Sequence, residues 1–201
     1  MKLLLTSAGL SNKKITDFFI SKLPKNLNKC SFLIVAYVQD EEEQSYVDYS
    51  KKELADLGIK DITYFNLKEN EFKGSKKYDV IYVCGGNTFS ILNRMRITGI
   101  IDFIKNSMKD NKTLYFGISA GSIIAGPNIE VASWGSIGDT NDISLKDLTG
   151  LNLTNISIFP HFEDYLEGEV DEFRKKVDYP VVELKDDEAL FIEGVKNKII
   201  K

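Results

Sequence analysis

The sequence predicts an α/β protein in which a parallel central sheet is covered by helices on both faces. Short apolar runs alternate with segments of helical spacing over residues 1–127. The run at residues 32–38 is almost continuously apolar, as expected of a strand that is buried on both faces. Glycine-rich turns follow the apolar runs that end near residues 83 and 118. Strands that alternate with helices in this way are typical of a parallel sheet.

The elements of the first 127 residues are expected in regular order. A glycine follows the second predicted helix at Gly58, a position where glycine commonly ends a helix. The expected strands are residues 2–6, 32–38, 62–65, 78–83 and the run that begins at 114 and leads to Ser119. The expected helices are residues 13–23, 41–57, a segment that starts near 88, and 100–108.

The pattern changes after Pro127. Residues 128–155 are polar and glycine-rich without a sustained period, so we expect loops and short strands over one edge of the sheet. A strand at 156–159 and a helix at 166–177 follow. Closing strands are expected at 180–184, 189–192 and 198–200.

Bulk composition indicates one soluble domain over residues 1–201. Hydrophobic residues make up 43% of the chain and charged residues 28%, which is ordinary for a globular protein. The net charge of −4, with basic residues spread along the chain, does not favour nucleic acid or a membrane surface as a partner. The cysteines, Cys30 and Cys84, lie far apart and indicate a reducing, cytoplasmic environment. The apolar run at the N-terminus is too short for a signal peptide or a membrane span.

The turn Gly117-Ile118-Ser119-Ala120-Gly121 is the most informative motif. It follows the apolar run Leu114-Tyr115-Phe116 and has the pattern Gly-x-Ser-x-Gly. Small residues on either side of the serine allow a sharp strand-to-helix turn that presents the hydroxyl above the end of a sheet. Ser119 is therefore a candidate nucleophile. A glycine-rich turn of this kind also occurs for packing reasons alone, so other residues must decide.

His161 is the only histidine of the chain and the natural candidate for a base. A serine hydroxyl becomes a good nucleophile only when a base takes its proton. His161 follows a predicted strand, and the carboxyl ends of parallel strands gather at one edge where ligands bind. The alternative interpretation is a surface-loop histidine without a role.

A third group, an acid, would fix the tautomer of the histidine and stabilise its charged form. An acidic turn follows the predicted strand at 180–184, and one of its residues could supply this acid, although such turns are often only solvated. The candidates are Asp186, Asp187 and Glu188. Glu163 and Asp164 lie so close to His161 in sequence that we expect them to line the loop.

Two backbone amides could hold an oxyanion. One is the N–H of Ala120, directly after the serine, and the other comes from the pair Gly85-Gly86. Glycine permits the backbone conformation that aims an N–H into a cleft, and a helix starting at Asn87-Thr88 would add its positive end. The alternative is a tight turn with a capping residue. Residues Gly85 and Asn87 are then expected beside the substrate.

Further candidates lie in the irregular segment. Asp139 or Asp142 could bind the α-ammonium group of a substrate, or could simply be solvated. Trp134 is expected to pack or to line a pocket, and Cys84 to be a small buried strand residue. The cysteines are in no metal-ligand spacing, and the absence of a phosphate-binding glycine motif disfavours a phosphate-binding loop.

Three motifs, and the order in which they occur along the chain, resemble those of serine peptidase family S51. This family contains the peptidase E α-aspartyl dipeptidases and, more distantly, the cyanophycinases. The motifs are Cys84-Gly85-Gly86-Asn87-Thr88-Phe89, Gly117-Ile118-Ser119-Ala120-Gly121 and Phe159-Pro160-His161-Phe162. The resemblance covers nearly the whole chain. It implies a flavodoxin-like three-layer α/β/α fold with a mostly parallel central sheet, related to class I glutamine amidotransferases. It also implies that no metal or cofactor takes part.

Carried onto this chain, the resemblance makes Ser119 the nucleophile, His161 the base, and Gly86 and Ala120 the oxyanion donors. The family acid is usually glutamate within Leu-Pro-Glu-Gly, and the match here, Leu184-Lys185-Asp186-Asp187, makes Asp186 the first choice and Glu188 the reserve. The chain departs from peptidase E by having Cys84 before the glycine pair. Candidate carboxylate partners are Arg94, Arg96 and Arg174.

The function expected from these residues is hydrolysis of short peptides by a serine-type peptidase. It would act as a monomer or homodimer on dipeptide-like substrates, with N-terminal Asp-X as one option for specificity. The alternatives are a non-catalytic small-molecule binding module on the same fold and a hydrolase of other amides or esters.

Overall fold

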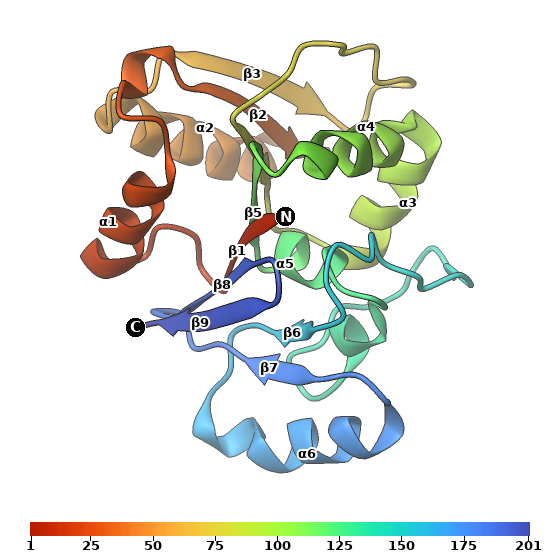
Figure 1. Ribbon diagram of the computed structural model, residues 1–201. Helices are drawn as coiled ribbons and strands as arrows, with labels where there is room; N and C mark the ends of the chain where they lie inside the picture. Colours follow the sequence, from red (N-terminus) through yellow and green to blue (C-terminus); the bar gives the residue numbers. More distant parts are fainter.

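The computed structural model describes all residues, 1–201, as a flavodoxin-like α/β protein with a seven-stranded, mostly parallel central sheet (Figure 1). The strand order is β3-β2-β4-β5-β1-β8-β9. The five strands β1 to β5 run parallel, whereas β8 and β9 pair antiparallel at one edge. Their bounds are β1 Lys2–Thr6, β2 Ser31–Ala36, β3 Asp61–Asn66, β4 Val80–Val83, β5 Leu114–Ile118, β8 Ala189–Glu193 and β9 Lys196–Ile200.

Helices cover both faces of this sheet. They are α1 Lys13–Lys22, α2 Glu41–Asp56, α3 Thr88–Thr98, α4 Ile100–Ser107 and α5 Ala120–Ile124, whereas α6 Glu167–Lys176 lies beside a second, smaller sheet (Figure 1). Asn12, Asp40 and Asn87 begin α1, α2 and α3 with side-chain oxygens that accept a backbone N–H of the first turn. Short 3₁₀ turns lie at η1 Leu27–Lys29, η2 Met108–Asp110, η3 Glu130–Ser133 and η4 Asp164–Leu166.

The strands divide their apolar side chains between two cores because successive residues of a strand point to opposite faces. In β1, Leu3 and Leu5 belong to the core with α3, α4, α5 and α6, whereas Leu4 belongs to the core with α1 and α2. All three leucines are fully buried. The predicted three-layer arrangement is therefore present.

A second, two-stranded parallel sheet lies beside the central one. It pairs β6 (Ser157–Phe159) with β7 (Val181–Glu183), and α6 connects the two strands (Figure 1). The sequence pattern places residues 180–184 with the closing strands, but only β8 and β9 close the central sheet. The reason is that β1 is already paired on both sides, with β5 and with β8, so the inner part of the central sheet offers no free edge.

The segment 128–155 forms turns rather than the expected short strands. Its regular structure is limited to η3 and an isolated bridge between Asn128 and Thr149. The guanidinium of Arg96 donates to the carbonyls of Asp147 and Thr149, and Asn87 donates to the carbonyl of Thr140. These contacts hold the segment against α3 at the carboxyl end of the sheet.

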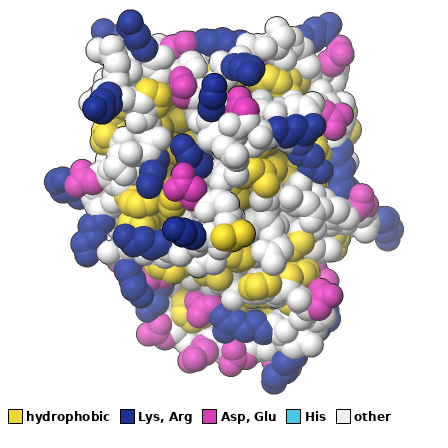
Figure 2. All heavy atoms as spheres, viewed as in Figure 1, with side chains coloured by type: hydrophobic (Ala, Val, Ile, Leu, Met, Phe, Trp, Pro, Cys, Tyr) yellow, Lys and Arg dark blue, Asp and Glu magenta, His cyan; other side chains and the backbone are white.

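The surface carries both signs of charge. On the face seen in Figure 2, lysine and arginine side chains are interspersed with aspartate and glutamate and do not gather into one patch. None of the helices has the length and apolar character needed to cross a membrane.

Candidate active site

Ser119 occupies the apex of a sharp turn between β5 and α5. Its backbone has φ 48° and ψ −110°, a conformation that residues other than glycine rarely adopt and that costs free energy. The flanking glycines are required by space: a Cβ on Gly117 would lie 2.7 Å from the carbonyl oxygen of Gly121, and a Cβ on Gly121 would lie 2.3 Å from that of Val83. Gly117 is therefore required because the turn folds back on itself, and Gly121 because the turn packs directly against β4.

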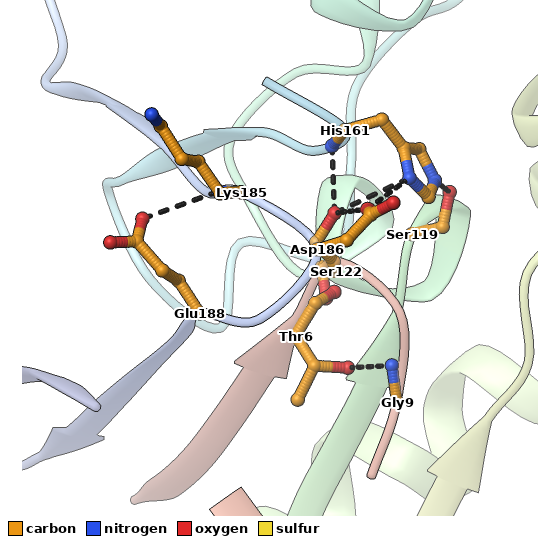
Figure 3. A network of polar contacts seen from close by, with 9 residues as sticks. Thr6, Gly9, Ser119, Ser122, His161, Lys185, Asp186 and Glu188 are labelled. Carbon is orange, nitrogen blue, oxygen red and sulfur yellow. Dashed lines mark hydrogen bonds and ion pairs between the residues drawn. The ribbon is translucent and has the colours of Figure 1, made fainter. Parts of the chain in front are cut away.

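His161 and Asp186 come to Ser119 from the two-stranded sheet, since they follow β6 and β7 at its carboxyl end. The imidazole Nε2 lies 2.9 Å from Ser119 Oγ, and Nδ1 lies 2.7 Å from Asp186 Oδ1 (Figure 3). With Nδ1 facing a carboxylate, the neutral ring carries its proton on Nδ1 and leaves Nε2 to accept from the serine hydroxyl. His161 also has a left-handed backbone, with φ 56°.

The other acids of this region point elsewhere. The carboxylate of Glu188 accepts the backbone N–H of Lys185 (Figure 3). It also lies 3.5 Å from the ammonium group of Lys201. Asp164 forms an ion pair with Lys185. Asp187 contributes its main-chain carbonyl to the side chain of Asn12. Of the three acids that the sequence offers in this turn, only Asp186 lies within hydrogen-bond distance of the imidazole.

The expected amide donors lie around the serine. Ala120 is the first residue of α5, so its N–H has no partner within the helix. Gly86 has φ 129°, a backbone conformation open to glycine. Gly85 adjoins the turn, since an added Cβ would lie 3.4 Å from the Cβ of Ser119, an ordinary contact distance. The chain therefore requires glycine at position 86, where it turns from β4 toward α3, rather than at position 85.

Asn87 and Asp139 have structural contacts at the start of α3. Asn87 Oδ1 accepts the N–H of Ser90, and its amide nitrogen donates to the carbonyl of Thr140. Asp139 Oδ2 accepts the N–H of Thr88 at 2.8 Å. Both oxygens therefore satisfy helix-terminal amides. Asp139 also lines a cavity beside Ser119. Asp142, the other candidate of the segment, accepts from the Thr140 hydroxyl.

Two cavities of unequal size meet at Ser119 and His161. The smaller has a volume of about 60 Å³, and segment 128–155, β6 and α5 form its wall. Trp134, which the sequence offers as a packing or pocket residue, lines it together with Ile137. The larger, of about 600 Å³, lies between α2 and the carboxyl ends of β1, β2 and β4. A substrate bound across Ser119 thus has a small cavity on one side and a large cavity on the other.

The larger cavity is aromatic and acidic. Its wall includes two glutamates, Glu43 and Glu53, and burial raises the pKa of Glu53 above its usual value. Its tyrosines are Tyr37, Tyr46, Tyr49 and Tyr82. Cys84 also lies on this wall and is almost fully buried, and burial raises the pKa of its thiol to about 12. That cysteine is therefore a neutral thiol near pH 7.

No lysine or arginine lines either cavity. The three arginines that the sequence offers as carboxylate partners have contacts elsewhere. Arg94 donates to carbonyls of residues 67–69, and Arg96 donates to segment 128–155. Arg174 pairs with Asp171 and Glu183. The structure has no group of three or more His, Cys, Asp or Glu side chains placed to hold a metal ion.

One polar residue at this edge was not predicted from the sequence to belong to the site. Ser7 directly follows β1 and contacts both His161 and Asp186. The available signal was its position, because it stands at the carboxyl end of a predicted parallel strand, where the other motifs also lie. A single serine after a strand is too common to be selected by that signal alone.

Comparisons with known proteins place the chain in a family. The model of peptidase family S51 matches residues 3–200. An uncharacterized peptidase of Listeria monocytogenes serovar 1/2a is 35% identical over 165 residues, which cover 77% of each chain. Peptidase E of Salmonella typhi is 30% identical over 181 residues, covering 87% of this chain and 74% of the relative. The sequence-based resemblance to this family is thereby confirmed.

Solved structures show the same fold. A Listeria monocytogenes EGD-e protein that is provisionally named peptidase E superposes with a TM-score of 0.78 at 26% identity, covering 98% of this chain and 96% of that chain. A peptidase from an acI-B1 Actinobacterium reaches a TM-score of 0.70 at 13% identity, which concerns the fold alone, and covers 99% of this chain and 86% of that one. Because the family model spans nearly the whole sequence, the chain belongs to peptidase family S51 and is a serine-type peptidase.

Proposed function

We propose that the protein hydrolyses short peptides through the triad Ser119, His161 and Asp186 and an acyl-enzyme. The observation that carries this proposal is the imidazole of His161, which has the serine hydroxyl at Nε2 and a carboxylate at Nδ1. This is the arrangement that a serine nucleophile requires: a base within hydrogen-bond reach, itself oriented by an acid.

In the proposed reaction, Ser119 Oγ forms a bond to the scissile carbonyl carbon while its proton passes to His161 Nε2. The carbonyl oxygen becomes an oxyanion and accepts from the N–H groups of Gly86 and Ala120. His161 then gives the proton to the leaving nitrogen, and the C–N bond breaks. Water adds to the acyl carbon in the same way, and the serine hydroxyl is restored. Asp186 stabilises the imidazolium that exists between these transfers.

The sizes and walls of the two cavities support a proposal about the substrate class. Because the small cavity holds about 60 Å³, we assign it the smaller part of the substrate, and the 600 Å³ cavity the larger part. Tyrosines and two glutamates favour an aromatic, apolar or basic group in the larger cavity over an acidic one. N-terminal Asp-X peptides are the less favoured option, since neither wall supplies a lysine or arginine to pair with the aspartate side chain.

A dipeptide library tests this proposal. The expected result is hydrolysis that Ser119→Ala and His161→Ala each lower by several orders of magnitude, about 10⁴-fold or more, with unchanged melting temperature. Peptides pairing a small residue with an aromatic or basic one should react faster than Asp-X peptides. Hydrolysis that survives in Ser119→Ala would exclude the mechanism, whereas a preference for Asp-X would exclude only the assignment of the cavities.

A further inference from the structure

Ser7 connects the two halves of the site. Its side chain is fully buried at the end of β1, which pairs with β5, the strand that carries Ser119. The Ser7 hydroxyl donates to Asp186 Oδ1 at 2.9 Å and accepts the backbone N–H of His161 at 2.7 Å. Its Oγ therefore bonds to the acid and to the main chain of the base at once.

Asp186 and His161 need such support because neither is enclosed by the protein. The side chain of Asp186 is 65% exposed and that of His161 is 45% exposed. Both follow β6 and β7, short strands that belong to a different sheet from Ser119. A partly solvated carboxylate on a turn can rotate away from the imidazole, and a shift of about 1 Å between reacting groups can lower a rate about 100-fold.

We propose that Ser7 is a positioning residue that fixes the Asp186 carboxylate and the His161 main chain against the central sheet. The Ser7 hydroxyl has one proton and donates it to Asp186. Although Ser7 Oγ lies 3.4 Å from His161 Nδ1, it therefore does not donate to that nitrogen, which can donate its own proton to Asp186. Oδ1 of Asp186 thus receives donors from both sides, one from β1 and one from the imidazole. The backbone N–H of His161, which has a left-handed conformation, donates to the Ser7 hydroxyl oxygen.

The chain contains a matched control in Ser31. Its hydroxyl donates to Asp79 Oδ2 at 2.9 Å and lies 3.2 Å from the Asp79 N–H, which donates to it. Ser31 is also nearly buried, and it begins β2 at the opposite end of the sheet from the turn of Ser119. Ser31→Ala removes the same kind of hydrogen bonds without touching His161 or Asp186.

The proposal rests on the proposed triad, so its test begins by establishing that wild-type hydrolysis of the best library dipeptide depends on Ser119. Ser7→Ala is expected to lower kcat about 10- to 100-fold and to leave KM within about twofold, because the hydroxyl orients the triad and does not bind substrate. Ser7→Cys, which keeps the size but donates weakly, should fall between wild type and Ser7→Ala. Ser31→Ala should keep the wild-type kcat.

A double-mutant cycle separates positioning from general stability. In an Asp186→Ala background, replacement of Ser7 by alanine is expected to lower kcat by a smaller factor than in the wild type, since only the hydrogen bond from the His161 main chain remains to be lost. An equal loss in both backgrounds would overturn the proposal, and so would a wild-type kcat in Ser7→Ala. If Ser7→Ala fails to fold, Ser7→Cys decides, and a wild-type kcat in that variant would overturn the proposal. If hydrolysis of the dipeptide proves not to depend on Ser119, that result would instead contradict the proposed function itself.

Discussion

Replacement of Gly121 by alanine is expected to damage both stability and the serine turn. The added Cβ would stand 2.3 Å from the carbonyl oxygen of Val83, whereas ordinary contact begins near 3.4 Å. Because the obstacle is backbone, α5 and β4 must separate by about 1 Å. Overpacking of this size costs about 1–3 kcal/mol. For a chain of this length each kcal/mol lowers the melting temperature by about 2–4 °C, so the expected fall is about 2–12 °C.

The same displacement moves Ser119 relative to His161. A shift of about 1 Å should lower the rate of reaction at the serine about 100-fold. The assays are thermal unfolding and the rate of covalent labelling by a fluorophosphonate probe. Gly168→Ala serves as the control: Gly168 lies in α6 with nothing within 4 Å of an added Cβ, and alanine favours a helix by up to about 1 kcal/mol. Wild-type stability and labelling in Gly121→Ala would refute the reasoning.

Asp186→Asn is expected to lower kcat by about 10²- to 10⁴-fold, while Asp187→Asn stays within about threefold, as measured by dipeptide hydrolysis. Equal losses in the two variants would contradict the assignment of the acid. Ile137→Ala should enlarge the small cavity and shift relative kcat/KM toward bulkier residues by about 10-fold, and unchanged ratios would exclude that cavity as a substrate site. Burial raises the pKa of the Cys30 and Cys84 thiols to about 12. Their protonated forms therefore stabilise the fold fully below pH 9, and this contribution is lost as the pH rises toward 12. Denaturant titrations should therefore give a lower free energy of unfolding at pH 10.5 than at pH 8, and this difference should be smaller in Cys84→Ala.

Much of the fold could be predicted because the apolar runs of β1 to β5 are short and distinct, and because α1, α2 and α3, which lie between several of these strands, begin at clear side-chain caps. The turn at Ser119 was visible because its glycines are required by close backbone contacts, that of Gly117 with Gly121 and that of Gly121 with Val83 of β4. The pairing of β6 with β7 was not predictable. Each strand has three residues, and a short apolar run carries no information about its partner.

The site was predictable where chemistry limits the choice. A single histidine leaves one candidate base, but three neighbouring acids leave the third group open until their orientations are known. Asp139 was selected as a substrate contact, yet one of its oxygens is used at the start of α3, which sequence spacing cannot reveal. The volumes of the two cavities depend on α2 and on segment 128–155, so neither was predictable.

The central claim is that Ser119 is a nucleophile activated by His161. The most direct measurement is the mass of the protein after reaction with a fluorophosphonate probe, followed by peptide mapping. We expect one adduct on the wild type, located on Ser119, and no adduct on Ser119→Ala or, over the same time, on His161→Ala. Continued dipeptide hydrolysis by an enzyme that carries no adduct, or an adduct on a residue other than Ser119, would contradict it.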